Sequence, residues 1–280
     1  MARSPITKKT IRSRTSKKKS KSLSWFWVFF VLAFLSIVGF YKFRKELKTY
    51  FYAHSTGTYQ TDKRSKARID SVLENHKNRA FGIDVSQYQG VINWEDVVKD
   101  TTEIPLTFVF VRATAGNDKE DQLFDENWQQ LKDKNLIRGA YHYYRPNENS
   151  LDQAKNFIKT VQLHKGDLPP VLDIEQLSKN QSLDSLKKGL QRWLDRVESH
   201  YGVQPIIYSG EKYYTDFLKK EFSKYTFWVA NYNEWVGTIK EDWAFWQFTE
   251  KAAISGISER VDLNIYNGTP KMLRYLTKRD

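Results

Sequence analysis

The chain has 280 residues, of which 40% are hydrophobic and 28% charged, and this globular composition excludes a wholly disordered protein. It contains no cysteine, which excludes a disulfide framework, a thiolate zinc site and a cysteine nucleophile. The formal net charge is +12, but the whole excess lies in residues 1–50, so the remaining chain is not a basic nucleic-acid binder and we expect no nucleic acid as partner.

The N-terminus has the pattern of a membrane anchor. Residues 1–24 hold nine basic residues and no acid, and we expect them to form a solvated cytoplasmic tail. Residues 25–41 (WFWVFFVLAFLSIVGFY) carry no charge and, as a helix, would rise about 26 Å, close to the hydrocarbon thickness of a bilayer. Aromatic residues lie at both ends, as they do at membrane interfaces. The sequence therefore predicts a transmembrane helix over residues 25–41.

The charges around this run predict its orientation. Nine basic residues precede it and four follow it, which keeps the N-terminus in the cytoplasm and places the C-terminal domain outside, in the periplasm or cell wall. A cleaved signal peptide is the alternative, although the run is long for one and lacks a small-x-small site. Residues 42–80 are polar and are expected to form a stalk, with some helical spacing at Ile69, Val72 and Leu73.

From residue 81 to residue 280 the pattern is that of an α/β domain. Eight short runs are almost continuously apolar, as strands covered on both faces are. They are Phe81–Val85, Phe108–Thr114, Ile137–Tyr144, Pro170–Glu175, Pro205–Ser209, Phe227–Tyr232, Trp243–Thr249 and Val261–Tyr266. Helical patterns separate the first six, at Trp94–Val98, Asp121–Asn135, Leu151–Leu163, Leu183–Tyr201 and Glu211–Leu218, with Ser150 and Ser182 as expected N-caps of the third and fourth.

This alternation predicts a parallel sheet, and eight strands can close into a barrel similar to a TIM barrel. About 200 residues is small for that fold, and the last three runs are joined by about ten residues each without a clear helix. We therefore expect an irregular barrel. Polar residues lie at the ends of the predicted strands, where a parallel barrel brings them to one mouth, and four of them are the carboxylates Asp84, Asp173, Glu175 and Asp262.

Asp173 and Glu175 are two residues apart and would share one face of a strand, with Cα atoms about 6.6 Å apart. Two adjacent carboxylates near apolar groups repel, so one is expected to keep its proton at neutral pH. A proton donor beside a carboxylate is what cleavage of a glycosidic bond requires. An isolated pair of this spacing is more often a strand end held by salt bridges, but Asp84, Asp262 and the aromatic residues favour a catalytic site.

Aromatic and amide side chains near the same strand ends predict a glycan-binding surface, because sugar rings pack on aromatic faces and their hydroxyls need polar partners. The expected substrate-binding residues are Tyr143, Tyr208, Asn231, Tyr232 and Gln247. About half of the neighbouring aromatic residues, Tyr141 and Trp246 among them, are expected to be core instead. The chain has no HExxH, G-x-S-x-G, GxGxxG or P-loop motif, and we expect neither a metal nor a cofactor.

Eight blocks of sequence, in order, resemble glycoside hydrolase family 25, the barrel-type lysozymes. They are FGIDVSQYQGVINW, FVFVRATAG, LIRGAYHYYRP, PPVLDIE, PIIYS, FWVANY, WAFWQFT and VDLNIY. The resemblance covers residues 81–266 and implies five β/α units followed by three strands, (β/α)5(β)3. It implies hydrolysis of the β-1,4 bond between N-acetylmuramic acid and N-acetylglucosamine in peptidoglycan glycan strands, without a cofactor.

In this resemblance Glu175 is the acid/base, Asp173 assists through the acetamido group of the substrate, and Asp84 and Asp262 complete an acidic floor. We expect retention of the anomeric configuration with Asp173 as electrostatic partner. Where the family often has T-E-G, this chain has Ala115 as the middle residue, which affects substrate fit more than catalysis. A decayed glycan-binding module or a scaffold of a wall-remodelling complex is the alternative to a monomeric, membrane-anchored lysozyme.

Overall fold

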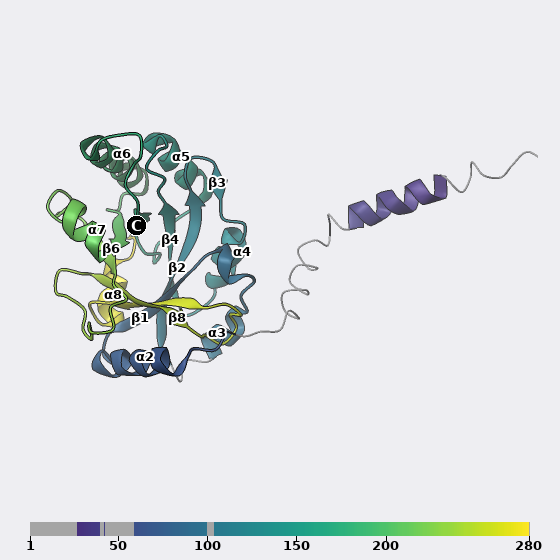
Figure 1. Cartoon of the computed structure of the whole chain (residues 1–280). Coiled ribbons are helices and arrows are strands. Elements are labelled where there is room, and N and C mark those ends of the chain that lie inside the picture. The colour runs from purple at the N-terminus through teal and green to yellow at the C-terminus, as the bar shows by residue number, and fades with distance from the viewer. Residues whose placement is uncertain (1–26, 40–41, 43–58, 100–103, 280) are drawn as a thin grey trace, which may run out of the picture. The chain divides into compact units, whose positions relative to one another are not determined.

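The computed structural model describes residues 27–39, 42, 59–99 and 104–279. The chain divides into two units, residues 1–51 and 52–280. In the first unit residues 27–39 form a helix, purple in Figure 1, whose apolar side chains are exposed. Among the described helices, none combines the length and the apolar character that crossing a membrane requires. Both ends of the predicted span, the predicted tail and residues 43–58 of the predicted stalk lie outside the described residues.

The described part of the second unit contains a closed barrel of eight strands. Figure 1 shows strands at the centre of this unit with helices around them. Around the barrel the order is β1, β2, β4, β5, β6, β7, β8 and β9, and β1 pairs with both β2 and β9. The strands are β1 (Ala80–Val85), β2 (Leu106–Ala115), β4 (Ile137–Tyr143), β5 (Val171–Asp173), β6 (Ile206–Gly210), β7 (Thr226–Ala230), β8 (Phe245–Ala252) and β9 (Val261–Tyr266). A short strand, β3 (Lys119–Glu120), pairs with the end of β2. Each predicted run overlaps one barrel strand, so the predicted barrel is confirmed.

One strand runs against the direction that the sequence predicts. Neighbouring barrel strands from β1 through β8 are parallel, but β9 is antiparallel to both β8 and β1. The reason is the connection: only residues 253–260 join β8 to β9, and a parallel pair needs a crossover of a dozen or more residues. The expectation of an all-parallel barrel is therefore wrong for β9. Because β9 is reversed, its first residues lie beside the last residues of β1.

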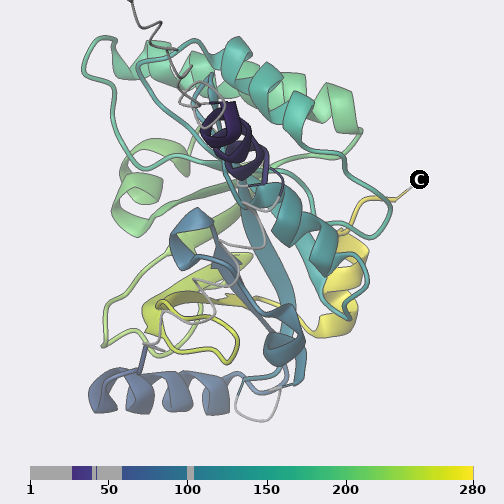
Figure 2. The same cartoon turned by 90° about the vertical axis from the view of Figure 1, so that its right-hand side faces the viewer.

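Helices cover the outside of the barrel, and α5 and α6 lie side by side in Figures 1 and 2. They are α3 (Trp94–Lys99), α4 (Phe124–Leu131), α5 (Ser150–Thr160), α6 (Leu183–Tyr201), α7 (Glu211–Tyr213), which continues into the π-helical turn Tyr214–Leu218, and α8 (Pro270–Leu276). Ser182 caps α6 as predicted, since its side chain accepts from the Ser185 backbone N–H. The N-cap of α5 is Asn149, not Ser150, because the longer side chain of Asn149 accepts from the N–H groups of residues 151 and 152.

Large aromatic rings fill the end of the barrel at which the parallel strands begin, called its lower end here; the upper end is where these strands finish. Phe110 stacks on Trp228 with ring centroids 4.6 Å apart and meets the edge of Phe245 at 5.5 Å. The facing positions on β1 and β4 are glycines, and a Cβ at Gly82 or Gly139 would lie less than 3.0 Å from the Phe108 or Phe110 ring. These rings close the barrel below, so the inward-facing residues at its upper end lie on a solid floor.

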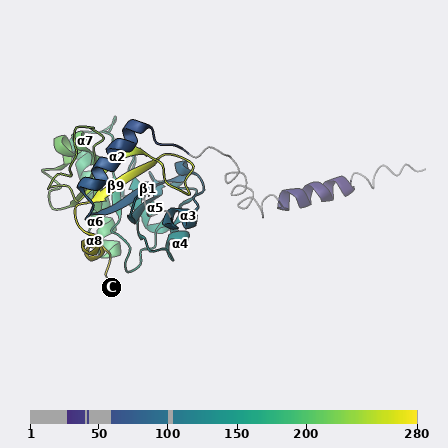
Figure 3. The ribbon, with the colours of Figure 1, turned by 90° about the horizontal axis from the view of Figure 1, so that it is seen from below.

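Helix α2 (Lys63–Asn75) packs on the outside of the barrel beside β8, as Figure 3 shows from below. Its residues Ile69 and Val72 are buried in the layer between the strands and the helices. Asp62 caps the helix, and the backbone N–H of Tyr59 donates to Ser258. Residues 59–79, which the sequence assigns to the stalk, thus belong to the compact unit, because α2 has an apolar face that the barrel covers.

Candidate active site

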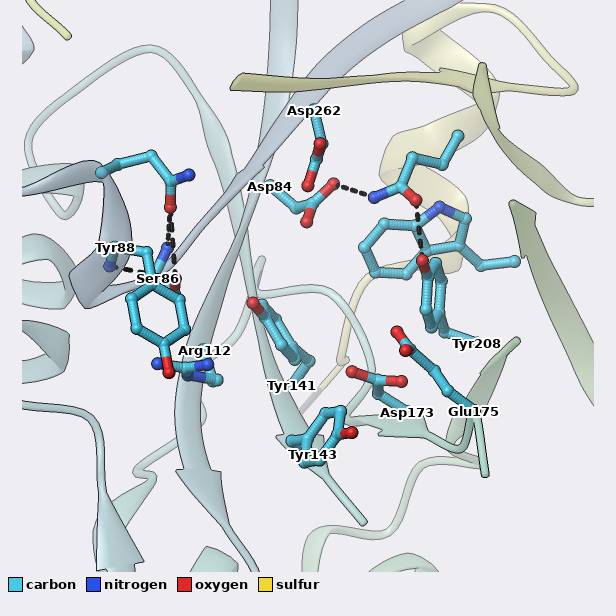
Figure 4. A pocket seen from close by; sticks show the side chains of 13 residues that line it. Asp84, Ser86, Tyr88, Arg112, Tyr141, Tyr143, Asp173, Glu175, Tyr208 and Asp262 are labelled. Carbon is cyan, nitrogen blue, oxygen red and sulfur yellow. Dashed lines mark hydrogen bonds between the residues drawn. The ribbon is translucent and has the colours of Figure 1, made fainter. Parts of the chain in front are cut away.

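A pocket of about 210 Å³ lies at the upper end of the barrel, shown in Figure 4. Its residues continue the strand alternation that places Phe108, Phe110 and Phe245 inside the barrel, so that Arg112 and Gln247 face inward two residues further on. The pocket is lined by Asp84, Ser86, Tyr88, Gln89, Arg112, Tyr141, Tyr143, Asp173, Glu175, Tyr208, Trp228, Gln247 and Asp262. All four carboxylates that the sequence singles out are therefore brought together.

Asp173 and Glu175 lie side by side in the pocket (Figure 4). Asp173 ends β5 and is 5% exposed, whereas Glu175 is at the exposed rim. The backbone between them still follows β6, because the N–H of Ile174 donates to the Tyr208 carbonyl at 3.0 Å and Ser209 Oγ donates to the Ile174 carbonyl at 2.6 Å. This extended backbone keeps both carboxyl groups on the inward face, as the spacing predicts, and turns Ile174 into the outer core.

The surroundings favour a proton on this pair. Burial, followed by the negative charges of Glu175 and Asp84, raises the pKa of Asp173 well above its usual value, and Arg112 opposes the shift. The carboxyl of Glu175 faces the pocket, where reduced hydration raises its pKa as well. Because two adjacent carboxyl groups resist simultaneous ionisation, the pair titrates as a unit and holds a proton towards neutral pH. Among the described residues, Oδ1 of Asp173 is buried and has no hydrogen-bond partner.

Asp84 and Asp262 form a second carboxyl pair across the antiparallel β1–β9 ladder. Asp84 Oδ2 accepts from Gln247 Nε2 at 2.7 Å and from Asn264 Nδ2 at 2.8 Å. Burial raises the pKa of Asp84 to about 6, and its hydrogen bonds to Asn264, Gln247 and Asp262 limit the rise. Burial and the charge of Asp84 raise the pKa of Asp262 to about 9. The proton of this pair is therefore favoured on Asp262 at neutral pH, and the protonated Asp262 donates a hydrogen bond to the Asp84 carboxylate.

Three of the five predicted substrate-binding residues, Tyr143, Tyr208 and Gln247, line the pocket. Gln247 is fixed by two phenols, since Tyr208 OH donates to its Oε1 at 2.7 Å and Tyr232 OH donates to the same atom. Tyr232 thus contacts the site through Gln247 and is not among the lining residues.

Asn231 is turned away from the pocket. Its Nδ2 donates to Glu211, and its Oδ1 accepts from the backbone N–H of Asn233 at 2.7 Å. The structure therefore does not bring Asn231 together with the other predicted substrate-binding residues, because Trp228 and Ala230 face into the barrel and the strand alternation points Asn231 the other way.

Several pocket residues were absent from the predicted site or assigned to the core. Arg112 Nε donates to Asp121 at 2.9 Å, and its guanidinium lies 4.6 Å from the centre of the Tyr88 ring. Tyr141, expected in the core, faces the carboxylates, as Figure 4 shows. Asn264, the second amide on Asp84, is not among the lining residues and accepts from Trp228 Nε1 at 2.8 Å. The signal that could have found these residues is strand parity, since each lies two residues from another inward-facing side chain.

Comparisons with known proteins agree on one family. Residues 83–257 match the family described as glycosyl hydrolases family 25. The uncharacterized protein YegX of Escherichia coli K12 is 36% identical over 275 residues, covering 93% of this chain and 94% of YegX. Lysozyme M1 of Streptomyces globisporus is 31% identical over 207 residues, 69% of each chain. Among solved structures, a family 25 glycosyl hydrolase from Bacillus anthracis superposes with a TM-score of 0.65 at 27% identity, covering 72% of this chain and 95% of that one.

The match covers more than half of the chain and includes Asp84, Asp173 and Glu175, while the fold adds Asp262 from beyond its end. The barrel, the four carboxyl groups at its mouth and these similarities lead to one assignment. The chain belongs to glycosyl hydrolase family 25, and it is a glycoside hydrolase.

Proposed function

We propose that the protein is a lysozyme that hydrolyses the β-1,4 bond between N-acetylmuramic acid and N-acetylglucosamine in peptidoglycan. The observation that carries the proposal is the pair Asp173 and Glu175, two adjacent carboxyl groups with raised pKa values at a mouth lined by tyrosines. The similarity to Lysozyme M1 supports the same substrate.

In this proposal Glu175 is the general acid that protonates the leaving glycosidic oxygen. Its position at the rim suits the role, because the carboxyl reaches the pocket and also meets the solvent that must later supply a water molecule. Its raised pKa keeps a fraction of the carboxyl groups protonated nearer to neutral pH than an ordinary glutamate. After bond cleavage the same group, now ionised, serves as the base that activates the water.

Asp173 is proposed to act on the 2-acetamido group of the bound sugar. Its unpartnered Oδ1 can accept a hydrogen bond from the acetamido N–H, which turns the carbonyl oxygen towards the anomeric carbon. As that oxygen attacks the anomeric carbon, the bond to the leaving oxygen breaks and the leaving oxygen takes the proton of Glu175. The oxazolinium ion that forms carries a positive charge, which the anionic Asp173 stabilises. The product then keeps the β configuration, as in other substrate-assisted glycosidases.

The second carboxyl pair has a different proposed part. Asp84 is held by two amides and by Asp262, so its charge has a fixed position near Asp173. This charge raises the pKa of Asp173 and adds negative potential where positive charge develops on the sugar. Tyr143, Tyr208 and Gln247 are proposed to contact the sugar.

We also propose that residues 25–41 anchor the protein in the cytoplasmic membrane, with the barrel outside and acting as a monomer. The uncharged run and the nine-to-four distribution of basic residues around it support this orientation. Protease treatment of spheroplasts tests it: the barrel is expected to be digested from outside, and a barrel left intact would contradict the proposal.

The activity is tested with the full chain, purified in mild detergent, on dye-labelled peptidoglycan sacculi. The wild type is expected to release soluble fragments, whereas Glu175→Gln, which changes one atom of the carboxyl group, is expected to bind the sacculi without releasing them. Binding without release by both proteins would favour a glycan-binding module or a scaffold over an enzyme.

A further inference from the structure

One arginine of α2 binds three backbone carbonyls of the barrel. Arg68 Nη1 donates to the carbonyl of Phe248 at 2.6 Å and to that of Tyr232 at 3.1 Å, and Nη2 donates to the carbonyl of Asn233 at 3.1 Å. Phe248 lies on β8, whereas the other two residues begin the loop between β7 and β8. A single guanidinium on the outside of the barrel thus joins a strand to the neighbouring loop.

The two segments that Arg68 joins are those that hold Gln247. The register of β8 on β9 shifts between Gln247 and Thr249, so Phe248 lies in an irregularity of the kind that re-aims neighbouring side chains. From the loop side, the N–H of Asn231 donates to the Gln247 carbonyl at 3.0 Å, and Tyr232 OH donates to Gln247 Oε1. Gln247 Nε2 in turn donates to Asp84 at 2.7 Å.

We infer that Arg68 is a positioning residue for the active site: by joining β8 to the β7–β8 loop it fixes Gln247, and through Gln247 it fixes the carboxylate of Asp84. Arg68 and the rest of α2 precede the residues that match the family. The kinetic consequence rests on the proposed lysozyme function, whereas the structural consequence does not.

The chemistry of arginine suits this role. Its planar fork donates along several directions at once and can serve carbonyls on two segments, whereas a lysine ammonium donates from a single nitrogen. The contact with the Phe248 carbonyl is partly buried, whereas those with Tyr232 and Asn233 are exposed. A partly buried carbonyl that loses its donor is costly to leave unpaired, so β8 and the loop are expected to move apart and admit water to it. A displacement of about 1 Å at a catalytic group can lower the rate by about 10²-fold.

Arg64 provides a matched control. It lies one turn before Arg68 on α2 and also reaches the β7–β8 loop, but through an exposed ion pair with Glu234. Exposed ion pairs contribute little to stability, so Arg64→Ala removes an arginine from the same helix without releasing the three carbonyls.

The first experiment measures amide hydrogen exchange by mass spectrometry in the full chain without substrate. In Arg68→Ala we expect exchange at least about tenfold faster in peptides covering residues 228–236 and 245–250, with peptides of α5 and α6 unchanged. Arg68→Lys is expected to lie between this variant and the wild type, and it also serves as the test if the alanine variant does not fold. Arg64→Ala is expected to match the wild type.

The second experiment measures kcat and KM on a soluble oligosaccharide of alternating N-acetylglucosamine and N-acetylmuramic acid. We expect kcat of Arg68→Ala to fall at least about tenfold with KM changed less than about threefold, and Arg68→Lys to recover part of kcat. Wild-type exchange and wild-type kcat in both Arg68 variants would overturn the inference. If the Arg68 variants exchange faster as expected but the wild type does not cleave the glycan, the lysozyme proposal is refuted and the positioning role remains supported.

Discussion

Replacement of Asp262 by asparagine tests the protonation pattern of the second carboxyl pair. Asp262 faces Asp84 across the β1–β9 ladder, and its raised pKa means that it is a hydrogen-bond donor at neutral pH. Asparagine has the same shape, and its amide N–H can donate to Asp84 at any of these pH values, whereas the carboxyl group of Asp262 can donate only while it is protonated. The exchange is therefore expected to preserve the pocket and to stabilise the fold more at high pH than at low pH.

The size of the effect follows from the two pKa values. Asp262 titrates at about 9 in the fold against a reference of 3.8 for an ordinary aspartate. Between these values the folded chain holds a proton that the unfolded chain has released, so the free energy of unfolding of the wild type falls as pH rises, by at most about 1.4 kcal/mol per pH unit. The free energy of unfolding of the asparagine variant does not fall in this way, because asparagine does not titrate. We expect its stability relative to the wild type to increase by about 1–4 kcal/mol between pH 5 and pH 8.

Urea unfolding of the full chain at pH 5, 6, 7 and 8 measures this difference. Asp133→Asn makes the same substitution at an exposed position and serves as the matched control for the loss of a carboxyl group. A stability difference for Asp262→Asn that stays constant, or that reverses with rising pH, would show that Asp262 is ionised in the fold and would refute the reasoning.

Three further changes test the site and its support. Glu175→Gln is expected to lower turnover of sacculi by about 10²–10⁴-fold with an unfolding midpoint no lower than that of the wild type, since the pKa of Glu175 is raised in the fold. Activity within about threefold of the wild type would show that the acid lies elsewhere. Asp173→Asn is expected to lower kcat by about 10²–10³-fold on N-acetylated glycan, and a glycosyl ester trapped on Asp173 would contradict substrate assistance. Asp167→Ala leaves Arg138 without the partner that its Nε contacts at 2.8 Å, both residues being 6% exposed, and should destabilise the fold by about 3–5 kcal/mol in urea unfolding. A loss below about 1 kcal/mol would show that the ion pair is dispensable.

The barrel could be predicted because both faces of its strands are buried. Runs such as Phe108–Thr114 are then apolar almost throughout, and their spacing reveals the intervening helices. The direction of a strand cannot be predicted from its apolar pattern, since it depends on the length of the connection that precedes it. The eight residues between β8 and β9 were the available signal for the reversal of β9, and that reversal places Asp262 opposite Asp84.

The charged residues of the site could be predicted from the sequence, whereas the neutral residues that hold them in place could not. Asp173 and Glu175 stand out because carboxylates are rare at the ends of buried strands. Asn264 and Tyr141 do not, because amides and tyrosines occur in cores as well as in sites. Strand parity places both on the inward face, but their position beside the carboxylates comes only from the fold. The attachment of α2 depends on Arg68 meeting carbonyls about 165 to 180 residues away, which no local pattern records.

We propose that the protein cleaves the bond between N-acetylmuramic acid and N-acetylglucosamine, and the identity of the sugar at the new reducing end tests this most directly. Sacculi digested with the full chain are reduced with borohydride, and the released fragments are analysed by mass spectrometry. We expect N-acetylmuramitol at the new ends in the wild-type digest and none above background with Glu175→Gln. Fragments ending in N-acetylglucosaminitol, or cleavage confined to the peptides, would contradict it.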